Sequence, residues 1–224
     1  MKILITAGAT REFFDPVRYI SNPSSGKMGY AIAAAAREKG WDVELVSANV
    51  SLTPPPGVCL TKVVTGDDML AAARERFPHC DILVKTAAVC DFRPKHYEVH
   101  KRKKDGKGMV VEFEPTTDIL KTLAAGKTAR QTVVGFAAET QDIEQYAQKK
   151  LREKNLDLIV ANLVGRGNVG AFGSDDNAVI LLGHDDFRKA FDLAPKTEIA
   201  RLLIDEIARF HAAKIARPAK HFSR

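Results

Sequence analysis

The stretch RYISNPSSGKMG (residues 18–29) gathers side chains that are well suited to binding an anion. It supplies hydroxyl groups, a glycine and a lysine immediately before YAIAAAAREKG, which has the pattern of a helix. A helix N-terminus carries about half a positive charge and unpaired backbone N–H groups, so phosphate is a natural ligand there. The residues of this region that we expect to bind phosphate are Arg11, Arg18, Ser24, Ser25, Gly26 and Lys27.

Two better-known nucleotide motifs do not fit this chain. A P-loop is excluded because position 21 is Ser instead of Gly and position 28 is Met instead of Ser or Thr. The dinucleotide fingerprint needs a tight turn, whereas a long loop separates Gly8 from Gly26. YEVHK (97–101) has the Tyr-x-x-x-Lys spacing of short-chain dehydrogenases, but it lies in a basic segment without a helical pattern. An NAD(P)-dependent dehydrogenase remains an alternative that needs Tyr97.

Other chemistry has less support. Lys150 and Lys154 are one helical turn apart and could face one anion, although ion pairs with Glu144 or Glu153 on an exposed face explain them as well. The six histidines show no metal-ligand spacing with Cys, Asp or Glu, so no metal site is predicted and metal ligands stay unassigned. Cys90 follows a strand, where a nucleophile could lie, but a small buried thiol is the simpler interpretation.

Length and composition narrow the class of protein. The 224 residues suit one domain, which we place at 1–213, followed by a basic tail at 214–224. The net charge of +6 favours anionic partners, either nucleic acid or small phosphorylated molecules. Aromatic residues are only 7%, which argues against a surface that stacks single strands. The sequence has no apolar run long enough to span a membrane and no signal peptide. Its three cysteines suggest reduced thiols rather than disulfides, so we expect a cytoplasmic protein.

Short apolar runs alternate with helical patterns along most of the chain, which predicts a doubly wound, mostly parallel α/β sheet. The alternation breaks at a basic flap, about residues 92–114, which contains HKRKKDGKG and whose second half resembles the return strand of a hairpin. In such sheets ligands bind beyond the carboxyl ends of the strands. The predicted strands are 2–6, 41–47, 61–65, 81–89, 132–138, 157–162 and 178–183, and the predicted helices are 28–40, 67–77, 117–126, 143–155 and 196–213.

The order of several segments resembles the phosphopantothenate–cysteine ligase (phosphopantothenoylcysteine synthetase) family. These segments are TAGATREFFDPVRYISNPSSGKMGYAIA, AAVCDFRP, a basic flap, TTDIL, VVGFAAET, KKLREKNLDLIVAN and GSDDNAVILL, which together cover about residues 2–212. The resemblance implies a Rossmann-like fold and a two-step reaction. The carboxylate of 4′-phosphopantothenate attacks the α-phosphate of a nucleoside triphosphate, and L-cysteine then displaces the nucleotide to form an amide.

The resemblance also assigns site residues. It implies catalytic roles for Asn22, Arg18 and Lys101, with Asn22 at the acyl-phosphate region and Lys101 reaching the triphosphate. It adds Gly8 and Asn22 to the phosphate-binding set described above. The flap register leaves Lys103 and Lys104 open as alternatives to Lys101. The implied nucleotide contacts are Ala87, Ala88, Asp91, Lys101, Thr117, Asp118, Ile119, Phe136, Lys150 and Lys154.

The implied co-substrate is CTP with Mg²⁺, which bacterial members typically use, with ATP as the alternative. Cys90 replaces an alanine of the family, a modest change in size that leaves the contacts in place. Thr117 replaces the proline of the family's loop and so loses its fixed φ, which bears on the base preference more than on the reaction. The first strand follows Met1 at once, so we expect a free-standing ligase without a flavin domain. We also expect a homodimer in which the flap of one subunit reaches the other's site. A noncatalytic nucleotide or nucleic-acid binder is the alternative from another class, and it would not need Asn22.

Overall fold

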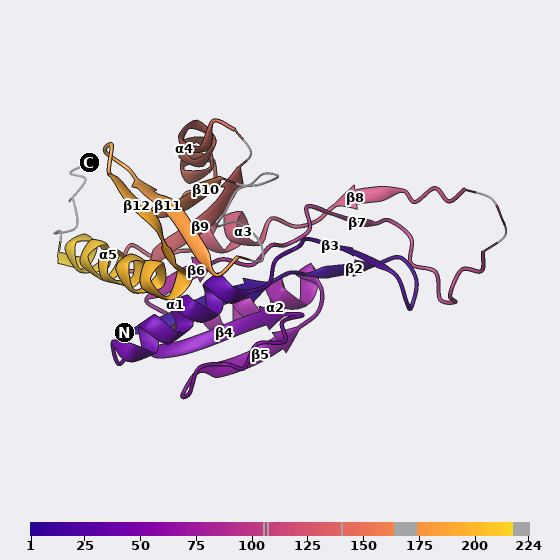
Figure 1. Cartoon of the computed structure of the whole chain (residues 1–224), viewed down its shortest axis with the longest axis horizontal. Coiled ribbons are helices and arrows are strands. Elements are labelled where there is room, and N and C mark those ends of the chain that lie inside the picture. The colour runs from indigo at the N-terminus through magenta and orange to yellow at the C-terminus, as the bar shows by residue number, and fades with distance from the viewer. Residues whose placement is uncertain (105, 107, 140, 164–173, 217–224) are drawn as a thin grey trace, which may run out of the picture.

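The computed structural model describes residues 1–104, 106, 108–139, 141–163 and 174–216. Its centre is an eight-stranded sheet in the order β12-β11-β10-β9-β6-β1-β4-β5 (Figure 1). Six neighbouring strands are parallel, and β11 and β12 add an antiparallel pair at one edge. The parallel strands are β1 (Lys2–Gly8), β4 (Asp42–Ala48), β5 (Cys59–Val63), β6 (Ile82–Lys85), β9 (Thr132–Glu139) and β10 (Leu158–Leu163), and the edge pair is β11 (Asp176–Gly183) and β12 (Arg188–Pro195).

The parallel strands follow the doubly wound order, in which the chain reverses direction across the sheet between β1 and β6. Alternate residues along each buried strand face opposite helical layers. On β6, Ile82 and Val84 face the layer of α1 and α5, whereas Leu83 faces the layer of α2, α3 and α4. The helices are α1 (Lys27–Glu38), α2 (Gly66–Arg76), α3 (Ile119–Ala125), α4 (Ile143–Glu153) and α5 (Lys196–Ala216), with a 3₁₀ turn at Phe77–His79. The predicted fold class is therefore confirmed.

Local sequence explains where several helices begin. Thr65 and Asp68 form a reciprocal capping box at the start of α2, and Asp118 caps α3 by accepting a hydrogen bond from the backbone N–H of Lys121 at 3.0 Å. Helix α1 begins differently, because its N-cap is Gly26 and no side chain caps it. Within the described residues, no helix is both long and apolar enough to cross a membrane.

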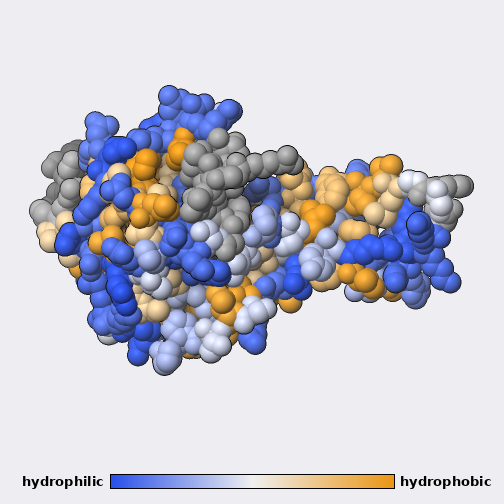
Figure 2. Space-filling model, in the orientation of Figure 1, coloured by the Kyte–Doolittle hydropathy of each residue, from blue (hydrophilic) through white to orange (hydrophobic). Residues whose placement is uncertain are grey.

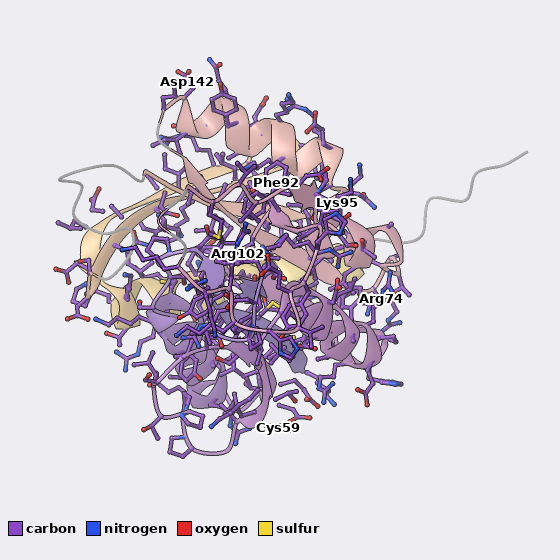
Figure 3. All side chains as sticks on the ribbon, turned by 90° about the vertical axis from the view of Figure 1, so that its right-hand side faces the viewer. Cys59, Arg74, Phe92, Lys95, Arg102 and Asp142 are labelled. Carbon is purple, nitrogen blue, oxygen red and sulfur yellow. The ribbon has the colours of Figure 1, made fainter. Side chains whose placement is uncertain are left out.

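A long arm projects from the carboxyl edge of the sheet (Figure 1). It is built from two small hairpins, β2 (Arg11–Phe13) with β3 (Tyr19–Ser21), and β7 (Phe92–Pro94) with β8 (Phe113–Pro115). The buried carboxylate of Asp15 joins the two halves by accepting hydrogen bonds from the backbone N–H groups of Val17, Arg18 and Arg102. Figure 3 looks along the arm from its free end, with Phe92, Lys95 and Arg102 in front of the core.

The structure differs from the sequence-based prediction in four places. The strand predicted at 81–89 ends at Lys85, and the residues after it form a loop. Strand β12 and the β2–β3 hairpin were not predicted. Helix α5 continues to Ala216, so the first three residues of the predicted basic tail are helical. The rest of that tail, 217–224, lies outside the described residues, as do residues 164–173 between the predicted strands 157–162 and 178–183.

Candidate functional site

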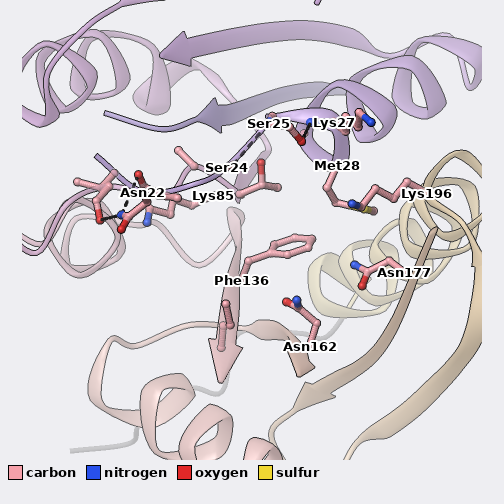
Figure 4. Close-up of a pocket in the computed structure, with 18 of the residues that line it drawn as sticks. Asn22, Ser24, Ser25, Lys27, Met28, Lys85, Phe136, Asn162, Asn177 and Lys196 are labelled. Atoms are coloured by element: carbon pink, nitrogen blue, oxygen red, sulfur yellow. Dashed lines mark hydrogen bonds between the residues drawn. The ribbon is translucent and has the colours of Figure 1, made fainter. Parts of the chain in front are cut away.

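A cavity of about 380 Å³ opens at the carboxyl ends of β1, β6 and β9, where the sheet order reverses (Figure 4). This is the position at which doubly wound sheets bind ligands. The loop before α1, the loop after β6 and the end of β9 supply most of the wall, and β10, β11 and α5 each add one residue. The lining residues are Asn22, Ser24, Ser25, Gly26, Lys27, Met28, Gly29, Lys85, Thr86, Ala87, Ala88, Val89, Asp91, Phe136, Ala137, Ala138, Asn162, Asn177 and Lys196.

The N-terminus of α1 forms one wall of this cavity. Gly26 has a φ of 77°, a left-handed conformation that glycine adopts without steric cost, and it turns the chain into the helix. The hydroxyl of Ser24 accepts a hydrogen bond from the backbone N–H of Gly26, and the hydroxyl of Ser25 accepts one from Lys27, at 3.4 and 3.5 Å. With no acidic residue in its first turn, this helix end presents positive potential to the cavity.

Gly29 lets α1 approach the sheet closely at the floor of the site. A Cβ atom built at position 29 would lie 2.6 Å from both the Cβ of Ala7 and the Oγ1 of Thr86. No L-side chain fits at such distances without movement of its neighbours. The glycine therefore fixes the distance between the helix N-terminus and the strand ends that face it.

Asn22 connects the loop before α1 to the loop after β6. Its side-chain amide donates to the carbonyl oxygens of Ala88 and Val89 at 3.4 and 3.3 Å. The loop after β6 is also held to β1 and its following loop, because the N–H of Ala88 donates to Gly8 at 2.8 Å and that of Cys90 to the hydroxyl of Thr10 at 3.1 Å. Both donors of the amide thus bind protein, and its oxygen remains to accept from a ligand.

Two lysines lie at one side of the cavity. Figure 4 places Lys27 and Lys196 at the side away from Asn22. Lys27 pairs with the carboxylate of Asp175 at 2.7 Å, and Lys196 donates to the backbone carbonyl of Ser174. The pKa of Lys196 lies below its ordinary value because of burial and then of the positive charge of Lys27. This side of the cavity therefore favours an anion that interacts with both ammonium groups.

A third lysine, Lys85, lines the cavity on the side of Asn22 (Figure 4). It is the last residue of β6 and is only partly exposed. Its pKa is lowered to about 8, mainly by burial and then by the positive charge of Lys154, while the carboxylates of Asp118 and Asp91 oppose the shift. Asp118 already forms an ion pair with Lys154 at 2.8 Å. The surroundings of Lys85 are therefore poor in compensating negative charge.

The structure brings about half of the predicted site residues to this cavity. Those that line it are Asn22, Ser24, Ser25, Gly26, Lys27, Ala87, Ala88, Asp91 and Phe136. The predicted residues that do not line it within one chain are Gly8, Arg11, Arg18, Lys101, Thr117, Asp118, Ile119, Lys150 and Lys154.

Three of these outlying residues belong to the arm or its base. The guanidinium of Arg18 binds the carboxylate of Asp15 at 2.9 Å and the backbone carbonyl of Arg102 at 3.1 Å, so in this chain it braces the arm. Arg11 lies over the ring of Tyr19, 4.6 Å from its centroid. Lys101 is exposed in the non-helical stretch of the arm. Their predicted contacts with substrate stay predictions.

The α3 and α4 residues lie beside the cavity wall. Ile119 is buried in the core, and Asp118 is occupied by the α3 cap and by Lys154. Lys150 and Lys154 both act on the pKa of Lys85, which places their charges near the cavity although neither lines it. The Glu153 ion pair considered for these two lysines is formed by Lys149 instead, at 3.8 Å.

Sequence reasoning missed half of the cavity's polar residues. Lys85 was placed inside a predicted buried strand, where a lone charge in an apolar run was the available signal. Asn162 is the last residue of the predicted strand 157–162, at the end where such sheets bind ligands. Lys196 begins α5, where a cation opposes the helix dipole. Asn177, on β11, carried no such signal. Among the described residues there is no group of three or more His, Cys, Asp or Glu side chains that could hold a metal ion.

A family model described as the C-terminal domain of the DNA/pantothenate metabolism flavoprotein (DFP) matches residues 1–210 of this chain. The chain belongs to this family. The coenzyme A biosynthesis bifunctional protein CoaBC of Bacillus subtilis (strain 168) is 47% identical over 207 residues, which are 92% of this chain and 50% of that protein. The CoaBC protein of Escherichia coli (strain K12) is 46% identical over 210 residues, 92% of this chain and 51% of that protein. The DFP-family chain thus spans about half the length of these relatives.

Solved structures agree with the family assignment. The crystal structure of the C-terminal domain of a CoaBC protein has a TM-score of 0.80 and 42% identity, covering 95% of this DFP-family chain and 96% of that chain. A mutant of Cab2 in complex with phosphopantothenate-cysteine has a TM-score of 0.79 at 19% identity, covering 96% and 87%, and shows the shared fold alone. The family resemblance found in the sequence is therefore confirmed.

Proposed function

We propose that this chain is a phosphopantothenate–cysteine ligase that acts in coenzyme A biosynthesis. It joins 4′-phosphopantothenate and L-cysteine through an acyl-nucleotide intermediate, with release of pyrophosphate and the nucleoside monophosphate. The observation that carries the proposal is the cavity at the switch point of a DFP-family sheet, with lysines on two sides and an asparagine side chain between two loops. The CoaBC names of the relatives support the pathway, and the ligand named for Cab2 is the product that this reaction would form.

The cavity suits the electrostatic task of this reaction. A triphosphate and a phosphorylated carboxylate repel each other, so an enzyme that joins them must neutralise charge and hold the reacting atoms close. In this proposal the α1 N-terminus, Lys27 and Lys196 neutralise phosphate groups on one side of the cavity. In this proposal Asn22 holds the loop after β6 in place through its amide donors, and so shapes the region in which the acyl phosphate would form.

The nucleotide in this proposal is CTP, with ATP as the alternative. Phe136 lines the middle of the cavity in Figure 4 and offers an apolar surface beside Asn162 for a base. Mg²⁺ is proposed to enter with the triphosphate, because the ion is usually held by one or two carboxylates together with substrate phosphates. It would neutralise part of the triphosphate charge. That the chain itself binds no flavin stays a prediction, which the absorption spectrum of the purified protein tests.

The arm is proposed to complete the site of a second subunit in a homodimer. Figure 2 shows hydrophobic surface along the arm, interrupted by charged side chains. The exposed large apolar residues of the flap are Phe92, Tyr97, Val99, Met109, Val110 and Phe113. Exposed apolar side chains gathered on a projecting element are typical of a protein interface. Exchange of arms would bring Lys101 and the neighbouring cations toward the cavity of the partner subunit. Sedimentation velocity tests this proposal by measuring whether the chain is a dimer.

The reaction is tested by incubating the protein with phosphopantothenate, cysteine, Mg²⁺ and either CTP or ATP, and by measuring pyrophosphate and the amide product. We expect product with one nucleotide and a higher kcat/KM with CTP. Asn22→Ala should lower kcat/KM by at least tenfold, because it removes the amide that spans the two loops. Lys62→Met, at an exposed position of the edge strand β5, is the control and should keep full activity.

Failure to release pyrophosphate with either nucleotide would refute the proposal. Full ligation by Asn22→Ala would refute the role of that residue but leave the reaction standing. The dehydrogenase alternative is not supported, because Tyr97 and Lys101 lie in the arm, outside any helix. A nucleic-acid binder would instead show salt-dependent affinity for polynucleotides that is independent of Asn22.

A further inference from the structure

We propose that Lys85 binds the reacting carboxylate of the phosphorylated substrate and takes up a proton as that substrate binds. This inference rests on the proposed ligase function and assigns a binding role to a residue that neither the motif nor the family resemblance singled out. Lys85 ends the central strand β6, is paired in register with Thr6 of β1 and Gly135 of β9, and lines the cavity.

Position in the sheet indicates which part of the substrates Lys85 meets. It lies at the switch point between β1 and β6, where ligands held by the two halves of a doubly wound sheet come together. Lys27 and Lys196 lie at the other side of the cavity (Figure 4). A substrate pair with phosphates near those two lysines would therefore place its second anionic group, the carboxylate, toward Lys85.

The charges around Lys85 leave its amine available. Lys85 makes no hydrogen bond or ion pair with the described part of the chain, in contrast to Lys154, which pairs with Asp118. The charged groups that act on it are Lys150 and Lys154 from α4, Asp118 from the start of α3, and Asp91 from the loop before β7. Of the two carboxylates, Asp118 is already paired with Lys154, which leaves Asp91 as the other acid that acts on Lys85.

A bound carboxylate would favour the protonated form of Lys85. In the free protein, burial and Lys154 lower the pKa of Lys85 to about 8. A bound anion favours the charged ammonium and raises that pKa, so substrate binding above pH 8 draws a proton from solvent. Below pH 8 the ammonium is already formed and no proton is needed. Affinity for the substrate should therefore fall with rising pH above 8 and stay level below it.

The test compares three proteins with wild type: Lys85→Met, Lys85→Arg and the control Lys62→Met, which removes an exposed lysine from the end region of another parallel strand. The KM for phosphopantothenate is measured by pyrophosphate release at saturating CTP, Mg²⁺ and cysteine between pH 7 and 9.5. The phosphate monoester stays dianionic over this range, since its second pKa is about 6. The KM for cysteine, measured in parallel, reports ionisations that belong to the amino acid.

We expect the wild-type and Lys62→Met KM for phosphopantothenate to rise roughly tenfold between pH 8 and 9.5. Lys85→Met should have a raised KM at every pH without this alkaline rise. Lys85→Arg should also lose the rise, because guanidinium stays charged throughout. Circular dichroism and denaturation establish that each variant is folded, and if one is not, the other variant decides.

Two results would overturn the inference. One is a wild-type alkaline rise that persists unchanged in Lys85→Met or Lys85→Arg. The other is a KM for phosphopantothenate in Lys85→Met equal to that of Lys62→Met at pH 7. Neither result requires the ligase reaction to be absent, whereas no pyrophosphate release by any of the proteins would refute the proposed function itself.

Discussion

Adding one methyl group at Gly29 perturbs the contact that sets the distance between α1 and the sheet. In Gly29→Ala the new Cβ would lie 2.6 Å from the Cβ of Ala7 and 2.6 Å from the hydroxyl of Thr86. Ordinary contacts between such atoms are about 3.5–4.0 Å. To restore such contacts, the helix and the strand ends would have to separate by about 1 Å, which moves the helix N-terminus away from the cavity.

Two opposing effects determine the change in stability. Alanine in place of glycine inside a helix stabilises it by about 1 kcal/mol. Overpacking of a well-packed site costs about 1–3 kcal/mol, and the upper part of this range applies because both contacts involve atoms at the strand ends. The expected net result is a loss of about 1–2 kcal/mol in the free energy of unfolding. Activity should fall as well, since Thr86 lines the cavity.

Urea denaturation of Gly29→Ala, followed by circular dichroism, measures this loss. Ala34→Gly in the same helix, at a partly exposed position, is the control for helix propensity and should cost about 1 kcal/mol. Thr86→Ala removes one of the two close contacts, so the double variant with Gly29→Ala should be more stable than the sum of the single effects predicts. A Gly29→Ala protein that is about 1 kcal/mol more stable than wild type would refute the close approach.

Two further predictions concern carboxylates outside the cavity. Asp157 is buried and forms ion pairs with Lys127 at 3.0 Å and Lys214 at 2.7 Å. Asp157→Asn should therefore lower the free energy of unfolding, measured by urea titration, by about 3 kcal/mol. A loss below about 1 kcal/mol would contradict this. Burial raises the pKa of Asp15, but hydrogen bonds from backbone N–H groups and the charge of Arg18 outweigh it, and the net pKa lies below the ordinary value. Its stabilising effect is therefore present at neutral pH and lost as the pH falls below about 4. Asp15→Asn should show a smaller acid-dependent loss of stability than wild type, and an equal loss would exclude this carboxylate as the cause.

Much of the fold could be predicted because its signals are local. The parallel strands β1, β4, β6, β9 and β10 are short apolar runs, and each is followed or preceded by a helical period. Strand β12 escaped prediction because it lies at the sheet edge and buries only Phe191 along RKAFDLAP. Its pairing with β11 is set by contacts that the local pattern does not encode. The β2–β3 hairpin was hidden for a similar reason, since its three-residue strands are too short to show a period.

The candidate site was predictable where one segment carries several of its residues. The loop before α1 and the loop after β6 each supply a run of lining residues. The first was identified from its place before a predicted helix, and the second from the family resemblance. Single residues from β10, β11 and α5 were not found, because only the folded sheet brings Asn162, Asn177 and Lys196 to the same edge. The role of Lys85 depends on its charged neighbours from α3 and α4, which are distant in sequence and carry no joint pattern.

Because the arm lies outside the central sheet, cleavage within it would divide the chain into two fragments. A protease that cleaves after the basic residues at 101–104 would cut a connection between β7 and β8 that lies outside the central sheet. The first fragment would keep β1, β4, β5 and β6, and the second would keep β9 to β12, with the β6–β9 pairing joining them. The chain thus divides into two half-sheets, with the cavity built from residues of both, so two separately produced fragments would have to reassociate to recover the site.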